Sequence, residues 1–211
     1  MGITSSGTCV VTGTMSSPYL KDPDVQLMLR VKKGDEQAFG QLVSNYQDRL
    51  IGLLTNMVGD RETAEDLTQE LFLRVYRARN GYEANAKFST WVFSIAHNLA
   101  SNSRRSKGRR KEVALAPADS GAQSTGVEAN LAEKSAMMPT RQLAKNELME
   151  RVQDAIGQLN ERQRMGLLLH KFEGLSYEDI GLAMEMTPQA VKSLLSRARE
   201  QLREVLESYV K

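Results

Sequence analysis

Apolar side chains recur every three or four positions along two long parts of the chain, residues 22–111 and 140–211, with polar side chains between them. This spacing places the apolar side chains on one face of an α-helix. The pattern therefore predicts an all-α protein with two helical domains.

Residues 22–111 are long enough for one compact bundle of four helices. An aspartate stands just before each of the first three apolar runs, where its carboxylate can cap a helix: Asp22, Asp35 and Asp60. The buried positions predicted for the third helix are Ala64, Leu67, Leu71, Val75 and Ala78. An irregular loop over residues 80–88 should precede the fourth helix, which is expected to start at Ser89 or Thr90.

Residues 140–211 are predicted to contain a helix-turn-helix. Ser176 caps a short helix, a tight turn follows, and Thr187 with Pro188 starts a longer helix. The second helix of such a motif enters the major groove of duplex DNA with its first turns. Exposed polar or basic side chains in those turns are Thr187, Gln189, Lys192, Ser193, Ser196 and Arg197. The alternative is a plain helical hairpin with a polar outer face.

Two segments lack helical periodicity. Residues 1–21 are rich in Ser, Thr and Gly and are predicted to form a disordered N-terminal extension. Residues 112–139 are rich in Ala, Ser, Gly and acidic side chains and are predicted to form a flexible linker. A coil of this length averages about 30 Å end to end and reaches about 95 Å when fully extended.

Composition excludes several classes of protein. No apolar run approaches the roughly 18 residues that a membrane helix requires. The single cysteine and the two histidines show no pattern typical of a disulfide or a metal site. No phosphate-cradling glycine loop and no catalytic constellation is present. We therefore expect a cytoplasmic protein that is not an enzyme and uses no metal, cofactor or small-molecule substrate.

The cationic charge lies in the first domain. Residues 24–111 carry 15 basic and 10 acidic residues, whereas the whole chain has a net charge of only +2. Aromatic faces stack on unpaired bases and cations follow phosphates, so an aromatic and basic stretch indicates a surface for single-stranded nucleic acid. This stretch contains Tyr82, Phe88, Trp91 and Phe93, followed by six basic residues within positions 104–111. The ordinary alternative is that the aromatic residues form helix core and the cations a solvated tail.

The outer face of the third helix carries Asp66, Gln69, Glu70 and Arg74. Asp66 and Glu70 are four residues apart, so their like charges share one side and repel slightly. This face is either simply solvated or a docking surface for a basic partner.

Several motifs resemble region 2 of the small bacterial sigma factors called extracytoplasmic function (ECF) factors. They are residues 66–72 (DLTQELF), 87–93 (KFSTWVF) and 95–98 (IAHN). A second set resembles region 4 of the same family: residues 159–164 (LNERQR), 173–180 (EGLSYEDI), 191–193 (VKS) and 197–200 (RARE). Both sets stand in the family's order, with region 2 in the first domain and region 4 in the second. Leu194 departs from the pattern, because relatives often carry a polar or basic residue there.

The resemblance implies that the protein binds core RNA polymerase, directs it to promoter DNA and helps to open the duplex. It assigns the polymerase contact to Asp66, Gln69 and Glu70. It assigns the duplex contact at the minus-thirty-five element to Lys192, Ser193, Ser196 and Arg197, and the helix-turn-helix reading adds Thr187 and Gln189 to that contact. Expected contacts to the minus-ten element as a single strand are Lys87, Phe88, Trp91, Asn98, Arg104 and Arg105. An anti-sigma factor is a further expected partner.

Two other classes of function stay open on the residues alone. A helix-turn-helix regulator would bind duplex DNA without core polymerase, and a helical scaffold that sequesters a sigma factor would show no dependence on DNA. Promoter elements two helical turns apart lie roughly 70 Å apart. The two domains can therefore reach both elements only if the linker is drawn out or the domains themselves span part of the distance.

Overall fold

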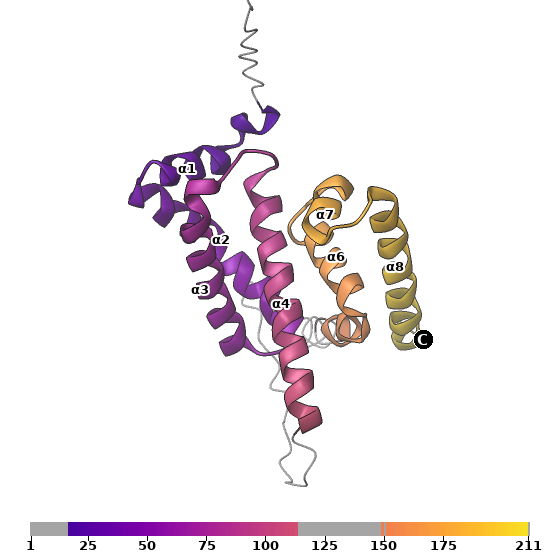
Figure 1. Ribbon diagram of the computed structural model, residues 1–211. Helices are drawn as coiled ribbons and strands as arrows, with labels where there is room; N and C mark the ends of the chain where they lie inside the picture. The colour runs from indigo at the N-terminus through magenta and orange to yellow at the C-terminus, as the bar shows by residue number, and fades with distance from the viewer. Residues whose placement is uncertain (1–16, 114–148, 150, 211) are drawn as a thin grey trace, which may run out of the picture.

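The computed structural model describes residues 17–113, 149 and 151–210, and the side chains within them except those of residues 107–113 and 208–210. These residues form helices and connecting turns and contain no strand (Figure 1). The prediction of an all-α fold is therefore confirmed for this part of the chain. None of the helices in it is long and apolar enough to cross a membrane.

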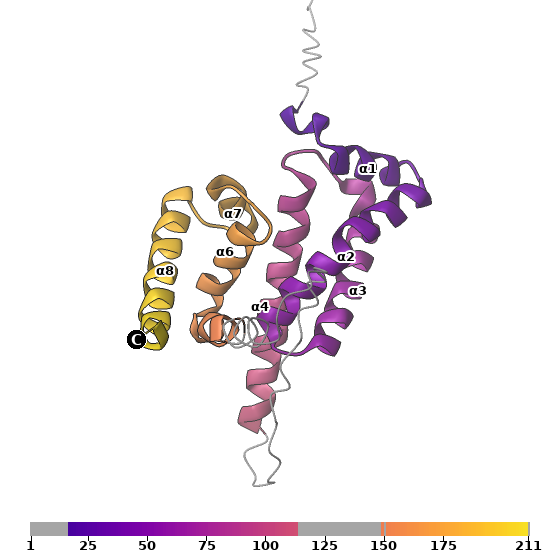
Figure 2. The same ribbon diagram turned by 180° about the vertical axis from the view of Figure 1, so that it is seen from behind.

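The first helical unit consists of four α-helices and two short 3-10 helices. Their bounds are η1 Pro18–Lys21, α1 Pro23–Lys32, α2 Glu36–Val58, α3 Arg61–Ala78, η2 Arg79–Gly81 and α4 Phe88–Val113. Helix α2 packs along α3, and α4 crosses both (Figures 1 and 2). Helix α4 begins at Phe88, one or two residues before the predicted start at Ser89 or Thr90.

Aspartate side chains cap the first three helices, as the sequence predicts. Asp22 Oδ1 accepts from the backbone N–H of Asp24 at 2.9 Å, and Asp35 Oδ1 accepts from that of Ala38 at 3.0 Å. Asp60 Oδ2 accepts from the N–H of Thr63 at 2.9 Å. Each bond satisfies an amide that has no partner within its own helix, and such a cap typically contributes about 1 kcal/mol.

The buried stripe of α3 differs from the predicted one at its last position. Ala64, Leu71 and Val75 are fully buried and Leu67 is half-buried, but Ala78 is exposed. Phe72 and Thr68 are buried as well, and Thr68 donates its hydroxyl proton to the carbonyl of Ala64. The buried face is therefore wider than one stripe, because α3 is covered by α2 on one side and by α4 on the other.

Residues predicted to be disordered contribute to this unit. Of the predicted extension 1–21, residues 1–16 lie outside the described part of the chain. The remainder forms η1, and the Ser17 hydroxyl donates to the carbonyl of Ala84. The Ser, Thr and Gly content of this segment predicted disorder, but two residues favour order. Pro18 fixes its backbone angle φ, and the ring of Tyr19 packs against the core.

The second helical unit begins with a helical segment at residues 151–158 and continues with three bounded helices. These are α6 Glu161–Lys171, α7 Tyr177–Met184 and α8 Pro188–Val210. Asn160 and Gln163 form a capping box on α6, and the Ser176 hydroxyl accepts from the Asp179 amide at the start of α7. Most of the predicted linker 112–139 lies outside the described residues, and α4 extends through its first two positions.

Helices α7 and α8 are joined by a tight turn that contains an unusual backbone conformation. Glu185 lies in the left-handed region, with φ of 55° and ψ of 49°. Thr187 Oγ1 then accepts from the Ala190 amide at 3.2 Å, with Pro188 as the first residue of α8. The predicted helix-turn-helix is therefore present.

The two units pack against each other through α4 and α7. In both views α7 and α6 lie beside α4, and α8 lies on the far side of them (Figures 1 and 2). Buried apolar residues of both units belong to one continuous core.

Candidate functional site

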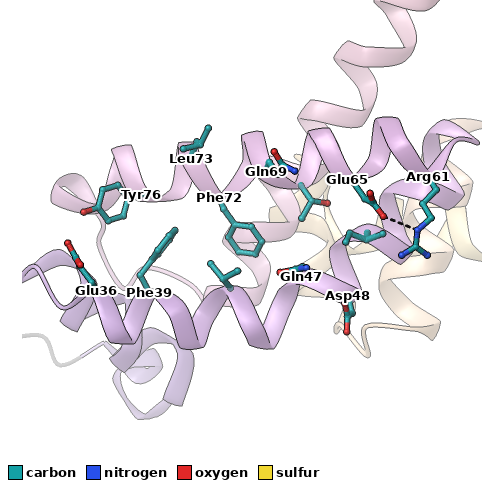
Figure 3. A pocket seen from close by; sticks show the side chains of 13 residues that line it. Glu36, Phe39, Gln47, Asp48, Arg61, Glu65, Gln69, Phe72, Leu73 and Tyr76 are labelled. Atoms are coloured by element: carbon teal, nitrogen blue, oxygen red, sulfur yellow. Dashed lines mark hydrogen bonds and ion pairs between the residues drawn. The ribbon is translucent and has the colours of Figure 1, made fainter. Parts of the chain in front are cut away.

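A groove runs along the surface between α2 and α3, with a volume of about 870 Å³ (Figure 3). Its floor is apolar and its ends carry charged or amide side chains. The lining residues are Glu36, Phe39, Val43, Gln47, Asp48, Ile51, Arg61, Glu65, Thr68, Gln69, Phe72, Leu73 and Tyr76.

The aromatic part of the groove has a definite shape because three rings contact one another. Phe39 packs edge-on against Phe72 with ring centroids 6.3 Å apart, and lies 5.0 Å from the ring of Tyr76. Beside them Leu73 is 54% exposed, and it points away from the α2–α3 seam in Figure 3. Leu73 and the aromatic floor of the groove therefore form an apolar area at the surface of the α2–α3 region.

The three residues predicted to contact polymerase lie on α3 at the edge of this groove or beyond it. Asp66, Gln69 and Glu70 are all exposed, and Gln69 lines the groove. Glu70 accepts a hydrogen bond from Arg74 at 2.5 Å. The positive charge of Arg74 therefore partly offsets the repulsion between the carboxylates of Glu70 and Asp66. The sequence did not predict this groove: Phe39 fits the apolar period of its helix as a core residue, and Phe72 and Leu73 lie outside the predicted stripe of α3.

A second hollow, of about 550 Å³, lies between the end of α3, the loop before α4 and the first turn of α4. Trp91 lines it and is half-buried, with its ring 5.0 Å from Tyr82 and 5.9 Å from Phe88. The remaining lining residues are Arg77, Ala78, Gly81, Tyr82, Glu83, Asn85 and Ala86. The hollow thus combines one accessible aromatic ring with polar groups of the loop.

The aromatic cluster is mainly core, which corrects the prediction of a stacking surface. Phe88 and Phe93 are fully buried and Tyr82 is 5% exposed. Phe88 packs against Tyr46 with ring centroids 5.2 Å apart, so it supports the loop and has no face free for a base. Trp91 alone among the four aromatic residues retains an exposed part. The core alternative is therefore correct for the other three.

The polar residues predicted for the minus-ten contact have different environments. Asn98 and Arg105 are exposed on α4, and Arg105 bonds to Asn102 one turn earlier. Arg104 is half-buried, with Nη1 shielded from solvent. Lys87 lies just before α4, and its Nζ donates to Asp179 Oδ2 of the second unit at 2.9 Å. That hydrogen bond holds the pKa of Lys87 above its usual value.

The helix-turn-helix presents its predicted face to solvent. All six residues predicted to contact duplex DNA are exposed, whereas Val191, Leu195 and Ala198 of the same helix are buried. Leu194 is half-buried, and its Cδ2 lies 2.8 Å from the position a Cβ at Gly166 would occupy. Leu194 therefore packs toward α6, which gives its apolar side chain a partner within the second unit.

No group of three potential metal-binding side chains occurs in the described ranges. Asp179, which the sequence alone does not mark as special, is a buried carboxylate, with 6% of the residue exposed. It accepts from Lys87, from the Thr90 hydroxyl at 3.0 Å and from the Ser176 hydroxyl at 2.8 Å. Burial alone would raise its pKa, but these three hydrogen bonds hold the pKa of Asp179 below its ordinary value. The cap by Ser176 was predicted from the sequence, but the partners of Asp179 from the first unit were not.

Comparison with known proteins places both units in one family. The family model for sigma-70 region 2 matches residues 42–110, and the model for sigma-70 region 4 matches residues 149–202. The RNA polymerase sigma-H factor of Pseudomonas aeruginosa is 37% identical over 190 residues, which cover 89% of this chain and 95% of that protein. The chain belongs to the ECF RNA polymerase sigma factors.

Other relatives agree with this assignment. The ECF RNA polymerase sigma-E factor of Haemophilus influenzae is 36% identical over 181 residues, covering 85% of this chain and 93% of the relative. A co-crystal structure of the sigma factor RpoE with the anti-sigma factor NepR from Bartonella quintana has the same fold. It matches with a TM-score of 0.62 and 21% identity, over 80% of this chain and 96% of that one. This sigma factor therefore has region 2 in its first helical unit and region 4 in its second.

Proposed function

We propose that this sigma factor acts in the cytoplasm, binds core RNA polymerase, directs it to promoters with a minus-ten and a minus-thirty-five element, and assists opening of the duplex. The observation that supports this most is the presence of regions 2 and 4 in one chain, each with an exposed face suited to its task. The sigma factor itself performs no catalytic step, because RNA synthesis belongs to the core enzyme.

The groove between α2 and α3 is the proposed polymerase contact. Its aromatic floor and the exposed Leu73 offer apolar area that docking would bury. Asp66, Gln69 and Glu70 stand at its rim, where acidic and amide side chains suit a basic partner surface. Apolar anchors surrounded by a polar rim are the usual arrangement of a protein interface.

The hollow beside Trp91 is the proposed contact for an unpaired minus-ten base. One face of Trp91 can stack on a base, and the backbone and side chains of the loop can read its edge. Asn98 and Arg105 lie exposed on α4, where they can contact the next nucleotides and the backbone. Capture of an extruded base would offset the few kcal/mol that unstacking costs.

The first turns of α8 are the proposed minus-thirty-five reader. Lys192 and Arg197 can donate to guanine edges or phosphates, and Gln189 can pair with adenine. Thr187 and the free amides at the start of α8 suit a phosphate. Residues 112–139 would act as the tether between the two readers, and an anti-sigma factor is a proposed partner, as the related RpoE binds NepR.

In vitro transcription with purified core polymerase over a library of randomised promoters tests the proposal. We expect transcripts that depend on both the sigma factor and core enzyme and that share two sequence elements. Tight duplex binding without core enzyme, together with no transcripts, would identify a conventional regulator instead. Failure to copurify with core polymerase would also refute the proposal.

A further inference from the structure

The loop before α4, residues 82–87, lines the hollow beside Trp91 and has little bonding of its own. Within it, the Asn85 amide donates to the Glu83 carbonyl at 2.9 Å. No helical ladder fixes the other carbonyls of this loop, and backbone carbonyls that leave water need partners. The shape of the loop, and of the hollow with it, therefore depends on groups outside the loop.

Two side chains that precede α2 donate to carbonyls of this loop. Lys32, the last residue of α1, donates from Nζ to the Tyr82 carbonyl at 2.8 Å. The Ser17 hydroxyl accepts from the Tyr19 amide at 3.3 Å and donates its proton to the Ala84 carbonyl. We refer to the Lys32–Tyr82 and Ser17–Ala84 bonds as the loop brace. The bond from the ammonium group is charge-assisted and is the stronger of the two in kind.

Helix α1 is a rigid base for the brace because its inner face is buried. Val25, Met28 and Val31 are at most 1% exposed, and α1 contacts η1, η2 and α4. In both views the loop before α4 runs beside α1 and η1 (Figures 1 and 2). Lys32 thus carries the fixed position of α1 to a carbonyl 50 positions later in the chain.

The brace acts on Trp91 through Tyr82. The backbone of Tyr82 is extended, and its ring lies 5.0 Å from that of Trp91 and 6.5 Å from that of Phe88. The Tyr82 hydroxyl is buried without a hydrogen-bond partner among the described residues, so no polar bond fixes the far end of the ring. The bond from Lys32 to the carbonyl of the same residue therefore helps to set where the ring lies, and with it the neighbouring face of Trp91.

We propose that Lys32 and Ser17 are positioning residues for minus-ten recognition, which hold the loop so that the hollow beside Trp91 accepts an unpaired base. Both residues precede residues 42–110, the part of the chain that the region 2 family model matches. The task of the hollow rests on the proposed function, whereas the brace is a property of the free chain. A loop that is ordered before DNA arrives loses less entropy on binding, so bracing strengthens capture of the base.

Tryptophan fluorescence of the free, full-length protein tests the brace directly. Trp91 is the single tryptophan of the chain, so its emission reports the hollow without a label. Lys32 is exposed, so Lys32→Ala removes nothing from the core. We expect this variant to raise the constant for quenching of Trp91 by acrylamide, an uncharged quencher. Ser17→Ala should raise it less, because its bond is between neutral groups.

Lys33→Ala is the matched control for the lysine. Lys33 is the next residue, is exposed, and has no side-chain hydrogen bond within the described residues. Its removal changes the net charge equally and should leave the quenching constant unchanged. Ser44→Ala, at an exposed position of α2, is the corresponding control for the serine. Equal quenching of Trp91 in Lys32→Ala and Lys33→Ala would overturn the brace.

Capture of the base is measured with the complex of core polymerase and sigma factor. The probe is a single strand carrying the minus-ten sequence selected from the promoter library, intact or with one abasic nucleotide at each position in turn. Lys32→Ala should reduce several-fold the preference for the intact strand at the captured position, and Lys32→Arg should restore most of it. Lys33→Ala should keep the parent preference. An equal loss of affinity for intact and abasic strands in Lys32→Ala would refute a positioning role.

The salt dependence of the same binding separates positioning from a direct phosphate contact. Removing a lysine that binds a phosphate lowers the slope of log affinity against log salt concentration by about 1. Lys32→Ala should have the same slope as Lys33→Ala, because Lys32 is engaged with a carbonyl. A lower slope in Lys32→Ala would assign Lys32 to the DNA backbone and overturn the positioning role. Absence of transcripts from the parent protein would instead refute the proposed function and leave the quenching comparison intact.

Discussion

Arg197 is an exposed cation on the third turn of α8, within the part of a helix-turn-helix whose side chains reach base edges. If it contacts a guanine, Arg197→Ala should weaken recognition of the minus-thirty-five element by about 1–3 kcal/mol. Lys192→Ala should act similarly at its own position. Filter binding or transcription by the polymerase complex at matched and mutated promoters measures the loss.

Arg203→Ala is the control for that experiment. Arg203 is an exposed cation on the same helix, but it lies further along and bonds to Glu200. It should change promoter selection little. An Arg197→Ala protein that initiates normally at every promoter in the library would remove Arg197 from the recognition set.

The backbone conformation of Glu185 costs free energy that a glycine at the same position would not lose. A non-glycine residue in the left-handed region is disfavoured by roughly 1–2 kcal/mol, and φ at Glu185 is 55°. We therefore expect Glu185→Gly to raise the unfolding free energy of the helix-turn-helix by about 1 kcal/mol. Thermal or denaturant unfolding measures the change.

The matching change inside a helix should have the opposite sign. Glu204→Gly, at an exposed position of α8, should lower stability by about 1 kcal/mol because glycine is a poor helix former. Loss of stability in Glu185→Gly would show that the Glu185 side chain contributes more than its backbone angle costs.

At the scale of the helices, a substitution in the groove between α2 and α3 can test the proposed polymerase contact without destabilising the fold. Leu73 is 54% exposed, so Leu73→Ser removes little from the core of region 2. If the groove docks on polymerase, the variant should weaken binding of core enzyme by about 1–2 kcal/mol, since burying a leucine is worth about 1.5–3 kcal/mol in full. Fluorescence titration with core polymerase measures this change.

Two further variants define the docking surface. Leu182→Ser removes an equally exposed leucine, 58% accessible, from α7 of region 4 and should leave the affinity for core enzyme unchanged. Asp66→Arg reverses a charge at the rim and should abolish the interaction while circular dichroism stays normal. Unchanged copurification of Leu73→Ser and Asp66→Arg would contradict the groove assignment.

At the scale of the whole molecule, the packing of region 4 on region 2 should depend on pH through His97 of α4. Burial is the main reason that its pKa lies below the usual 6.5, and Nδ1 is shielded without a hydrogen-bond partner. The charged groups that face it come from region 4: Glu161 and Arg162 of α6, and Glu185 of the turn. The desolvation that disfavours the imidazolium thus depends on how region 4 packs on region 2.

The sign of the pH effect follows from that depressed pKa. When region 4 separates from region 2, His97 becomes solvated and binds a proton more readily, so acidification below the ordinary pKa of about 6.5 weakens the packing of the two units. Spin labels at exposed Gln37 and Glu204, in a chain with Cys9→Ser, report the separation of the two units and should show a growing long-distance fraction as the pH falls from about 7 to 5.5. His97→Gln should flatten this response, and His170→Gln should not; a response that survives His97→Gln would assign it to another group.

The length of the predicted linker limits how far apart the two DNA-binding regions can lie. Removing half of the predicted linker, residues 118–131, leaves 14 residues that reach at most about 50 Å, less than the roughly 70 Å between promoter elements. We expect transcription from promoters that require both elements to fall, while affinity for core polymerase stays the same. Full activity of the shortened protein would show that the domains themselves span the distance.

Much of this molecule follows from local sequence. Asp22, Asp35, Asp60 and Ser176 cap helices because their side chains reach amides within three residues, and this geometry depends on nothing distant. The exposed face of α8 follows equally from its apolar period. The motifs of regions 2 and 4 identified the family for the same reason, since they are continuous segments.

Tertiary packing decided the rest. Whether Phe88 offers a face to DNA, whether Phe39 and Leu73 border a groove, and which cation meets Asp179 all depend on elements far apart in the chain. The spacing of apolar residues shows which side chains share one face of a helix. Whether that face is buried depends on which other helix packs against it. The pairing of Lys87 with Asp179 spans 92 positions. Such a contact depends on how region 4 lies against region 2, which no local pattern specifies.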